Sequence, residues 1–277
     1  MPDSSTNIKY YLENGNPKIL PLPELMEKPA LQIYEVLRVI DGIALFEEDH
    51  FARYFNSCSI LHVSTFVSAK KFSEQIAALI SLNQLAEGNI RVELNTGASG
   101  EQHVRMFVFP HQYPTSHQYQ MGVKVGLLRA VRENPKVKLV QQSVRDRASQ
   151  AMLENKWFEV LLVDHDSCIT EGSRSNVFFV REGAFYTSPG NKVLSGITRK
   201  KIMECINTLG MHCFELDIKE DELDSFEAAF ISGTSPKILP IASVQSIAYQ
   251  VNHPSMRQLM HEFDQMILAY VEERKTP

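Results

Sequence analysis

Residues 170–180 read Thr-Glu-Gly-Ser-Arg-Ser-Asn-Val-Phe-Phe-Val, and no other stretch constrains this chain as strongly. A polar turn of glycine, serine and asparagine leads into an apolar run that is rich in strand-forming residues. The pattern predicts a strand that begins near Val177, with Glu171 at its mouth. Acidic side chains in turns commonly cap their own turn, so Glu171 taken alone is either a capping residue or a functional acid.

Two turns further along the chain have the character of anion-binding sites. Gly196-Ile197-Thr198-Arg199 opens a predicted helix over residues 197–209, and the free N–H groups at a helix start attract phosphate. Ser232-Gly233-Thr234-Ser235 follows a predicted strand over residues 228–232. Each turn alone is a weak signal, because Ser195 could simply cap the helix and the second stretch could be an ordinary turn.

One lysine upstream, Lys138, stands in a suitable context between Val137 and Leu139. Apolar neighbours lower the pKa of a lysine amine and favour its neutral, nucleophilic form. Lys136, two residues earlier and on the same face of the predicted strand, is the alternative. An amine, an acid and two anion-binding turns together point to a cofactor that is a phosphorylated aldehyde.

The composition limits what else the protein can be. Its 277 residues are 44% hydrophobic and 22% charged, which is typical of a globular protein, and its net charge of −5 carries no sign of nucleic-acid binding. No apolar run approaches the roughly 20 residues that span a bilayer, and the N-terminus lacks the pattern of a signal peptide. The four cysteines have no metal-ligand spacing. We therefore expect a cytoplasmic protein with reduced cysteines, no metal site and no membrane or nucleic-acid partner.

The order of predicted elements indicates an α/β chain with two domains. A polar, proline-containing stretch over residues 111–121 is the best boundary. The expected domains are therefore 1–115 and 120–277. Before the boundary we predict strands at 31–40, 89–95 and 103–110 and helices at 47–61 and 69–83. After it we predict strands at 123–129, 159–163, 177–181 and 228–232 and helices at 143–155, 197–209 and 256–274.

Taken together, these motifs resemble the fold-type IV pyridoxal-phosphate enzymes, the class IV aminotransferases, over roughly residues 30–245. Residues 171–178 are in register with the family motif Glu-Gly-Ser-x-Ser-Asn-x-Phe, and the spacing from Lys138 to Glu159 fits family members without a gap. The resemblance implies an N-terminal α/β sandwich and a C-terminal pseudo-barrel that carries most of the cofactor site. It also implies a homodimer that binds pyridoxal 5'-phosphate.

The resemblance assigns a role to individual residues. Lys138 is the lysine that forms the Schiff base with the cofactor, and Glu171 is the partner of the pyridine nitrogen. The other cofactor-binding residues that it implies are Arg53, Ser173, Ile197, Thr198, Thr234 and Ser235. Arg53 belongs to His50-Phe51-Ala52-Arg53, which matches the family's His-x-x-Arg-Leu except that Tyr54 replaces the leucine. The bare sequence would instead make Arg53 an exposed helix arginine.

The substrate-binding residues implied by the resemblance are Tyr34 and Thr96. Tyr34 corresponds to a phenylalanine or tyrosine in a family strand, although a core aromatic is an equal reading of the sequence. D-amino-acid aminotransferases carry an arginine after the strand equivalent to residues 91–95 to bind the α-carboxylate, and this chain has Asn95-Thr96-Gly97 there. Because this arginine is absent from the expected position, the resemblance does not identify the substrate.

The activity implied is the transfer of an amino group between an amino acid, with branched-chain amino acids among the candidates, and a 2-oxo acid. One alternative is a lyase of the 4-amino-4-deoxychorismate type, which uses the same lysine and glutamate and releases pyruvate. The other is a non-catalytic relative that keeps the fold and binds the cofactor or a partner.

Overall fold

The computed structural model describes residues 8–22, 29–64, 67–97, 99–110, 112–132, 135–139 and 142–275. The chain divides into two compact units. The first comprises Met1–Gln112, Val137–Val140 and Leu268–Pro277, and the second comprises Tyr113–Lys136 and Gln141–Ile267. The segment that contains Lys138 therefore belongs to the first unit. The N-terminus on which the signal-peptide expectation rests and His111 of the predicted boundary lie outside the described residues.

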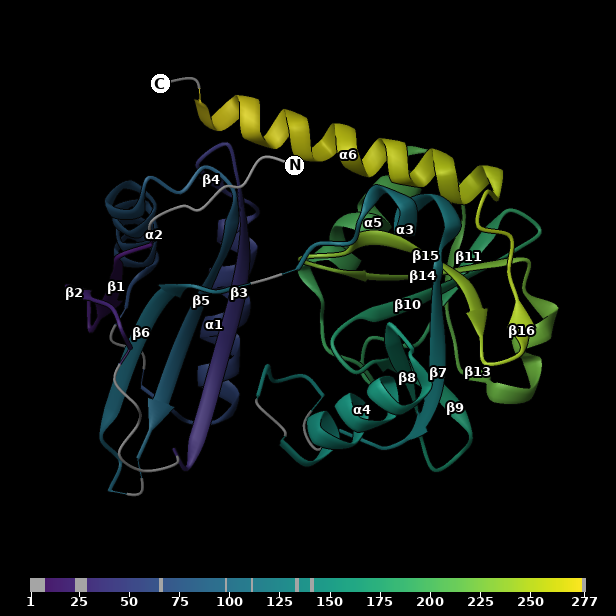
Figure 1. The fold of residues 1–277 in the computed structure, drawn as a ribbon, viewed down its shortest axis with the longest axis horizontal. Coiled ribbons are helices and arrows are strands. Elements are labelled where there is room, and N and C mark those ends of the chain that lie inside the picture. The colour runs from purple at the N-terminus through teal and green to yellow at the C-terminus, as the bar shows by residue number, and fades with distance from the viewer. Residues whose placement is uncertain are drawn as a thin grey trace. The chain divides into compact units, whose positions relative to one another are not determined.

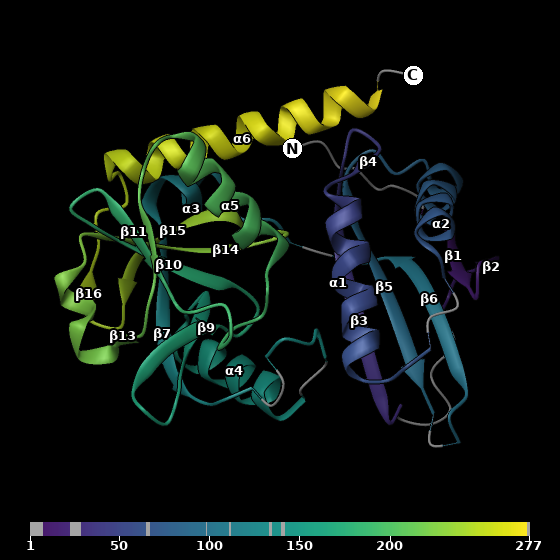
Figure 2. The same cartoon turned by 180° about the vertical axis from the view of Figure 1, so that it is seen from behind.

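The first unit is a six-stranded antiparallel sheet with two helices on one face (Figures 1 and 2). The strand order is β2-β1-β6-β5-β3-β4. The strands are β1 (Tyr10–Glu13), β2 (Asn16–Ile19), β3 (Leu31–Ile40), β4 (Ile43–Ala44), β5 (Gly88–Thr96) and β6 (Gln102–Val108). The helices are α1 (Glu47–Ile60) and α2 (Ala69–Asn83). Strand β3 and helix α2 match the predicted ranges residue for residue.

The alternation of buried residues along β3 explains how this sheet is built. Ile33, Leu37 and Val39 are fully buried and join one core with Tyr54 of α1 and Phe72 of α2. Because side chains alternate along a strand, Glu35 shares the helix face with these core residues, whereas Tyr34, Val36 and Arg38 lie on the opposite face. The predicted Asp41-Gly42 turn closes the β3–β4 hairpin with positive φ at both residues, as a tight two-residue hairpin requires.

The second unit is built on a ten-stranded mixed sheet (Figure 1). The strand order is β12-β11-β10-β14-β15-β7-β8-β9-β13, and β16 pairs with β15. Side chains from β10 through to β9 contribute to a single core, so the sheet curves around its own apolar interior. The mixed α/β class expected from the sequence is confirmed. No helix within the described ranges is both long and apolar enough to cross a membrane.

The elements of the second unit have the following bounds. The strands are β7 (Val123–Arg129), β8 (Glu159–Val163), β9 (Cys168–Gly172), β10 (Asn176–Arg181), β11 (Ala184–Thr187), β12 (Cys213–Glu215), β13 (Ile218–Lys219), β14 (Ala228–Gly233), β15 (Lys237–Val244) and β16 (Ile247–Ala248). The helices are α3 (Ser116–Met121), α4 (Gln142–Asn155), α5 (Ile197–Thr208), the 3₁₀ helix η1 (Glu220–Ser225) and α6 (Pro254–Lys275), whose last residues belong to the first unit.

Two elements of the second unit differ from the expectation in an informative way. Helix α3 lies inside the polar stretch predicted as a linker, where Thr115 and Gln118 form a capping box that starts a short helix. Strand β9 ends in Thr170-Glu171-Gly172, which reads as a turn in the sequence. Glu171 therefore lies within a strand of its own rather than at the mouth of the next one.

The contact between Gly126 of β7 and the single tryptophan, Trp157, gives a test of the packing. A β-carbon on Gly126 would lie about 2.1 Å from the indole ring. Gly126→Ala should therefore displace Trp157, shift the tryptophan fluorescence and lower the free energy of unfolding by about 1–3 kcal/mol, as overpacking does. Gly190→Ala is the matched control, because its new methyl would have no neighbour closer than 3.8 Å. Equal behaviour of the two variants would contradict this packing.

Candidate active site

Glu171 is buried in β9 and is held by two partners. Its Oε1 lies 2.8 Å from Nε of Arg132, and its Oε2 accepts a hydrogen bond of 3.1 Å from the main-chain N–H of Leu194. The same arginine donates to the main-chain oxygen of Ser173 at 2.5 Å. A buried carboxylate is tolerated only when it is paired, so Arg132 is what allows an acid at this position.

The Gly-Ser-Arg-Ser turn after Glu171 is organised by a second buried carboxylate, Glu159. Glu159 accepts hydrogen bonds from the hydroxyls of Ser173 (2.6 Å) and Ser175 (3.0 Å) and from the main-chain N–H of Arg174 (3.2 Å). The turn is so tight that a β-carbon on Gly172 would lie 2.0 Å from Oγ of Ser175. The hydroxyl of Ser173, predicted to bind the cofactor, is therefore engaged in shaping the turn.

The start of α5 has the features of an anion site. Gly196, rather than Ser195, occupies the N-cap position, and no side-chain cap bond forms there. A β-carbon on Gly196 would lie 2.1 Å from Oδ1 of Asn176, so this backbone approaches its neighbour as only glycine can. Ile197 and Thr198 follow, each 7% exposed. The uncapped N–H groups of the first turn are suited to hold a phosphate.

The second predicted phosphate turn lies beside the same asparagine. Ser232 is directly opposite Asn176 in the β10–β14 ladder, so the two side chains share a face. The hydroxyl of Ser232 is fully buried and has no hydrogen-bond partner among the described residues. Leaving such a group unsatisfied costs about 1–3 kcal/mol, so an acceptor supplied at this position would be favourable. Thr234 and Ser235 follow in the turn to β15, and Ser235 is buried.

Glu171 and this anion site are connected through one short loop. The N–H of Leu194 donates a hydrogen bond to Glu171, while the carbonyl of Leu194 accepts a hydrogen bond of 3.1 Å from Nδ2 of Asn176. Gly196 is only two residues further along. The structure therefore brings together the predicted ring acid and both predicted phosphate turns within the second unit.

In the first unit, Arg53 is buried, which excludes the exposed-arginine reading. Its Nε and Nη2 donate to the two oxygens of Glu35 at 2.8 and 2.6 Å, and Nδ1 of His50 lies 2.8 Å from the same carboxylate. Burial alone would raise the pKa of Glu35, but the charge and hydrogen bonds of Arg53 and His50 outweigh it and lower the pKa to about 2. Burial lowers the pKa of His50, and because an ionised Glu35 can only accept hydrogen bonds, Nδ1 of His50 is the donor.

Lys138 also lies in the first unit, against the edge of β3. Its carbonyl accepts a hydrogen bond of 3.1 Å from the N–H of Tyr34, and its Nζ lies 4.9 Å from the centre of the Tyr34 ring. The guanidinium of Arg91 lies 4.7 Å from the centre of that ring and pairs with Glu93 at 2.5 Å. Lys136, the alternative lysine, is exposed in a turn.

The two residues predicted to bind substrate are not brought together. Tyr34 is opposite Glu93 in the β3–β5 ladder, whereas Thr96 is opposite Leu31. Since 93 and 96 differ by an odd number of residues, their side chains point to opposite faces of the sheet. Tyr34 shares its face with Arg91, and Thr96 lies on the face that carries the helices.

The sequence reasoning did not single out several residues of this arrangement. Arg91 appeared only as the end of a strand, and Glu159 only as a strand opening. Arg132 precedes Lys138 by six residues with no motif around it. Arg91 lies on a predicted strand and could have been considered as a carboxylate partner, but no local sequence pattern links Arg132 or Glu159 to its partners.

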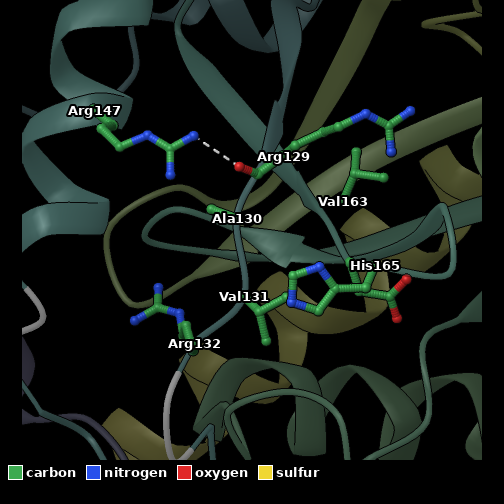
Figure 3. A pocket seen from close by; sticks show the side chains of 8 residues that line it. Arg129, Ala130, Val131, Arg132, Arg147, Val163 and His165 are labelled. Atoms are coloured by element: carbon green, nitrogen blue, oxygen red, sulfur yellow. Dashed lines mark hydrogen bonds between the residues drawn. The ribbon is translucent and has the colours of Figure 1, made fainter.

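Arg132 also lines a cavity of about 560 Å³ in the second unit (Figure 3). Its lining residues are Arg129, Ala130, Val131, Arg132, Arg147, Val163, Asp164 and His165. Arg147 of α4 donates a hydrogen bond of 2.8 Å to the main-chain oxygen of Arg129 (Figure 3). Arg132 therefore both lines this cavity and pairs with Glu171.

Comparison with known protein families identifies this arrangement. The model of the amino-transferase class IV family matches residues 32–244, most of the chain. The chain belongs to this family. As a class IV enzyme it is similar to a D-alanine aminotransferase of Bacillus licheniformis, with 26% identity over 86% of this chain and 88% of the relative. It is 25% identical to a branched-chain-amino-acid aminotransferase of Pseudomonas aeruginosa, over 76% of this chain and 75% of that protein.

Solved structures show the same fold at lower identity. The branched-chain amino acid aminotransferase of Escherichia coli superposes with a TM-score of 0.86 at 21% identity, covering 94% of this chain and 95% of that one. A putative 4-amino-4-deoxychorismate lyase of Legionella pneumophila gives 0.78 at 20%, covering 84% and 90%. A branched-chain amino acid aminotransferase from T.th., solved with pyridoxamine 5'-phosphate, gives 0.83 at 18%, covering 95% of both chains.

The buried Glu35 cluster predicts a specific pH dependence. The pKa of Glu35 is lowered from 4.5 to about 2, so its stabilising effect is complete above pH 4.5 and is lost as the pH falls toward 2. Glu35→Gln should lower the free energy of unfolding by about 3–5 kcal/mol at neutral pH, because Arg53 is left buried without its counter-ion. The difference from the parent protein should shrink between pH 4.5 and 2.

The control for this change is Glu74→Gln, which removes an exposed ion pair with Lys70 in the same unit. Such a pair contributes about 0–1 kcal/mol, so the variant should unfold almost like the parent. Urea unfolding at a series of pH values provides the measurement. A constant difference between Glu35→Gln and the parent throughout the acid range would show that Glu35 is not an ionised partner of Arg53.

Proposed function

We propose that this class IV enzyme uses pyridoxal 5'-phosphate to move an amino group between an amino acid and a 2-oxo acid. The observation that carries the proposal is the connection of Glu171 to the start of α5 through Leu194. An acid and an anion site joined by so short a piece of backbone suit a ligand that has both a basic ring nitrogen and a phosphate. The bound pyridoxamine 5'-phosphate in one structural relative supports the same cofactor.

The residues present fit this cofactor on their own chemistry. The N–H groups of Ile197 and Thr198, the Thr198 hydroxyl and the turn at Thr234 and Ser235 would hold the phosphate. The unsatisfied hydroxyl of Ser232 would gain an acceptor there. Arg53, fixed by Glu35, would add a charge-assisted contact. Ser173 would act by fixing the turn after Glu171.

The cofactor, Glu171 and Lys138 would each have a separate chemical role. When bound, the cofactor supplies an electron sink for negative charge that develops at the α-carbon of the substrate. Glu171 would keep the ring nitrogen protonated, and Arg132 would keep Glu171 in place. Lys138 would hold the aldehyde covalently and, once released by the substrate amine, would move the proton at the α-carbon.

Arg91 is our candidate for binding the substrate carboxylate. The sequence lacks the arginine that D-amino-acid aminotransferases carry after this strand, but Arg91 shares the Tyr34 ring with Lys138. A guanidinium recognises a carboxylate with two parallel hydrogen bonds. Arg91 also bears on the non-catalytic alternative, because a missing carboxylate arginine is one of the two observations that favour it; the other is the sequence after Lys138, which lacks the common Asn-Tyr pattern. Branched-chain specificity and a homodimer remain predictions.

The lyase alternative is favoured by one observation, the fold likeness to a putative 4-amino-4-deoxychorismate lyase. It would use the same Lys138 and Glu171 but release pyruvate with no amino acceptor. A coupled assay separates the two: a transaminase needs a 2-oxo acid and converts 2-oxoglutarate to glutamate, whereas the lyase does not.

Borohydride reduction followed by peptide mapping tests the attachment of the cofactor. The pyridoxyl label should appear on Lys138 and should vanish in Lys138→Arg, because arginine does not form the imine. Lys136→Arg is the matched control and should label normally, since its side chain is exposed in a turn. A label on Lys136 or Lys237 in the parent protein would overturn the assignment.

The acid is tested by Glu171→Gln. The variant should keep the cofactor, because the phosphate contacts are intact, but should lose several kcal/mol of transition-state stabilisation, on the order of a lost charged contact at a reacting centre. Steady-state kinetics provide the measurement. Glu204→Gln, which alters a pair with Lys201 on α5, should retain full activity. Undiminished turnover in Glu171→Gln would remove the acid from the mechanism.

A further inference from the structure

The last two turns of α6 contact the start of α1 within the first unit. The hydroxyl of Tyr270 accepts a 3.1 Å hydrogen bond from the main-chain N–H of Glu47 and donates a 2.9 Å bond to the carboxylate of Glu48. The guanidinium of Arg274 pairs with Glu48 and lies 3.5 Å from the centre of the Tyr270 ring. We call Tyr270 and Arg274 the C-terminal clasp.

Helix α1 depends on this clasp because it has no side-chain cap of its own. Its N-cap residue is Phe46, which has a φ of 52°, a left-handed conformation that large side chains rarely adopt. The Phe46 ring makes an edge-on contact with the Tyr270 ring, with centroids 4.9 Å apart. Tyr270 therefore supplies both the missing cap of the helix and the packing that holds its strained first residue.

The helix that receives this cap carries His50 and Arg53. Both side chains are buried and both bind Glu35 of β3. His50 donates its main-chain N–H to the carbonyl of Phe46, so the first turn of α1 is tied directly to the residue that Tyr270 supports. Hydrogen bonds on the Glu48 carboxylate from Arg274 and Tyr270 outweigh the effect of its burial and lower its pKa, in keeping with a formed clasp.

We propose that Tyr270 is a positioning residue for the cofactor phosphate, acting through α1 and Arg53. The inference rests on the proposed role of Arg53 as a phosphate ligand. Capping by Tyr270 fixes the first turn of α1, and the first turn fixes the register in which His50 and Arg53 meet Glu35. Loss of the hydroxyl would let this turn fray and would weaken the hold of Arg53 on an anion.

A role limited to stability would affect every ligand equally, so the test compares two cofactors that differ only in the phosphate. Apo-protein is titrated with pyridoxal 5'-phosphate and with pyridoxal, and the two dissociation constants are measured by absorbance in phosphate-free buffer. Tyr270→Phe should weaken binding of pyridoxal 5'-phosphate by about three- to tenfold, the scale of a lost helix cap, and leave pyridoxal unchanged.

Two further variants frame this result. Arg274→Met removes the ion pair with Glu48 but leaves the Tyr270 hydroxyl, so it should give a smaller loss in the same direction. Tyr249→Phe is the matched control, because it removes a buried tyrosine hydroxyl bond to the carbonyl of Leu223 in the second unit and should alter neither constant. An equal loss for both ligands in Tyr270→Phe, or no loss for either, would overturn the proposal.

Arg53→Lys separates failure of this inference from failure of the proposed function. If Arg53 binds the phosphate, this variant should lose affinity for pyridoxal 5'-phosphate selectively, since the single ammonium of lysine cannot bind both oxygens of Glu35 and an anion as the guanidinium can. A selective loss in Arg53→Lys without one in Tyr270→Phe rejects the clasp alone. No selective loss in Arg53→Lys rejects both the phosphate role of Arg53 and the clasp that depends on it.

Discussion

A carboxylate can remain inside a protein only if its charge is matched, and three of the buried glutamates, Glu35, Glu159 and Glu171, show how this requirement shapes the fold. Glu35 is matched by Arg53 and His50, and this ties α1 to β3. Glu159 is matched by hydroxyl and N–H donors that shape the turn after Glu171. Glu171 is matched by Arg132 and by the N–H of Leu194, which fixes the loop before α5. Most of the predicted cofactor contacts lie on a segment that one of these carboxylates holds.

The sequence predicted the parts of this arrangement that are local. The alternation of β3, the periodicity of α2 and the glycine that opens α5 are properties of a few consecutive residues, and all three appear in the structure. Strand β9 was not predicted from the sequence, because Thr170-Glu171-Gly172 has the composition of a turn. Glu171 is tolerated in a strand only because Arg132, far away in sequence, pairs with it. No local pattern reports such a partner.

The same reasoning explains what remained hidden at the candidate site. The opposite faces of Tyr34 and Thr96 follow from the strand register, which depends on long-range pairing. The lack of a hydrogen-bond partner for the Ser232 hydroxyl among the described residues can be recognised only once the pairing of β14 with β10 is known. Lys138 and Glu171 stand out as motif residues, yet their chemical roles rest on resemblance until they are tested. The physical contribution of the structure is to identify the groups that hold them in position.

Membership of the class IV family narrows the chemistry but leaves the substrate open. Relatives at 25% and 26% identity include a branched-chain-amino-acid aminotransferase and a D-alanine aminotransferase, which are named for different amino acids. In this chain Asn95-Thr96-Gly97 stands where D-amino-acid enzymes are expected to carry an arginine, whereas Arg91 shares one face of the first sheet with Tyr34 and Glu93. Substrate choice should therefore be sought on that face, since the acid and the phosphate turns serve the cofactor.

The most direct test of the central claim is a half-reaction without any amino acceptor. The protein loaded with pyridoxal 5'-phosphate is mixed with candidate amino acids or with 4-amino-4-deoxychorismate, and the cofactor spectrum and the released oxo acid are followed together. Our account predicts that a reactive amino acid yields one equivalent of 2-oxo acid per site, converts the cofactor to its amine form and then stops until a 2-oxo acid is added. Continuous release of pyruvate from 4-amino-4-deoxychorismate, with the cofactor remaining in its aldehyde form, would contradict it.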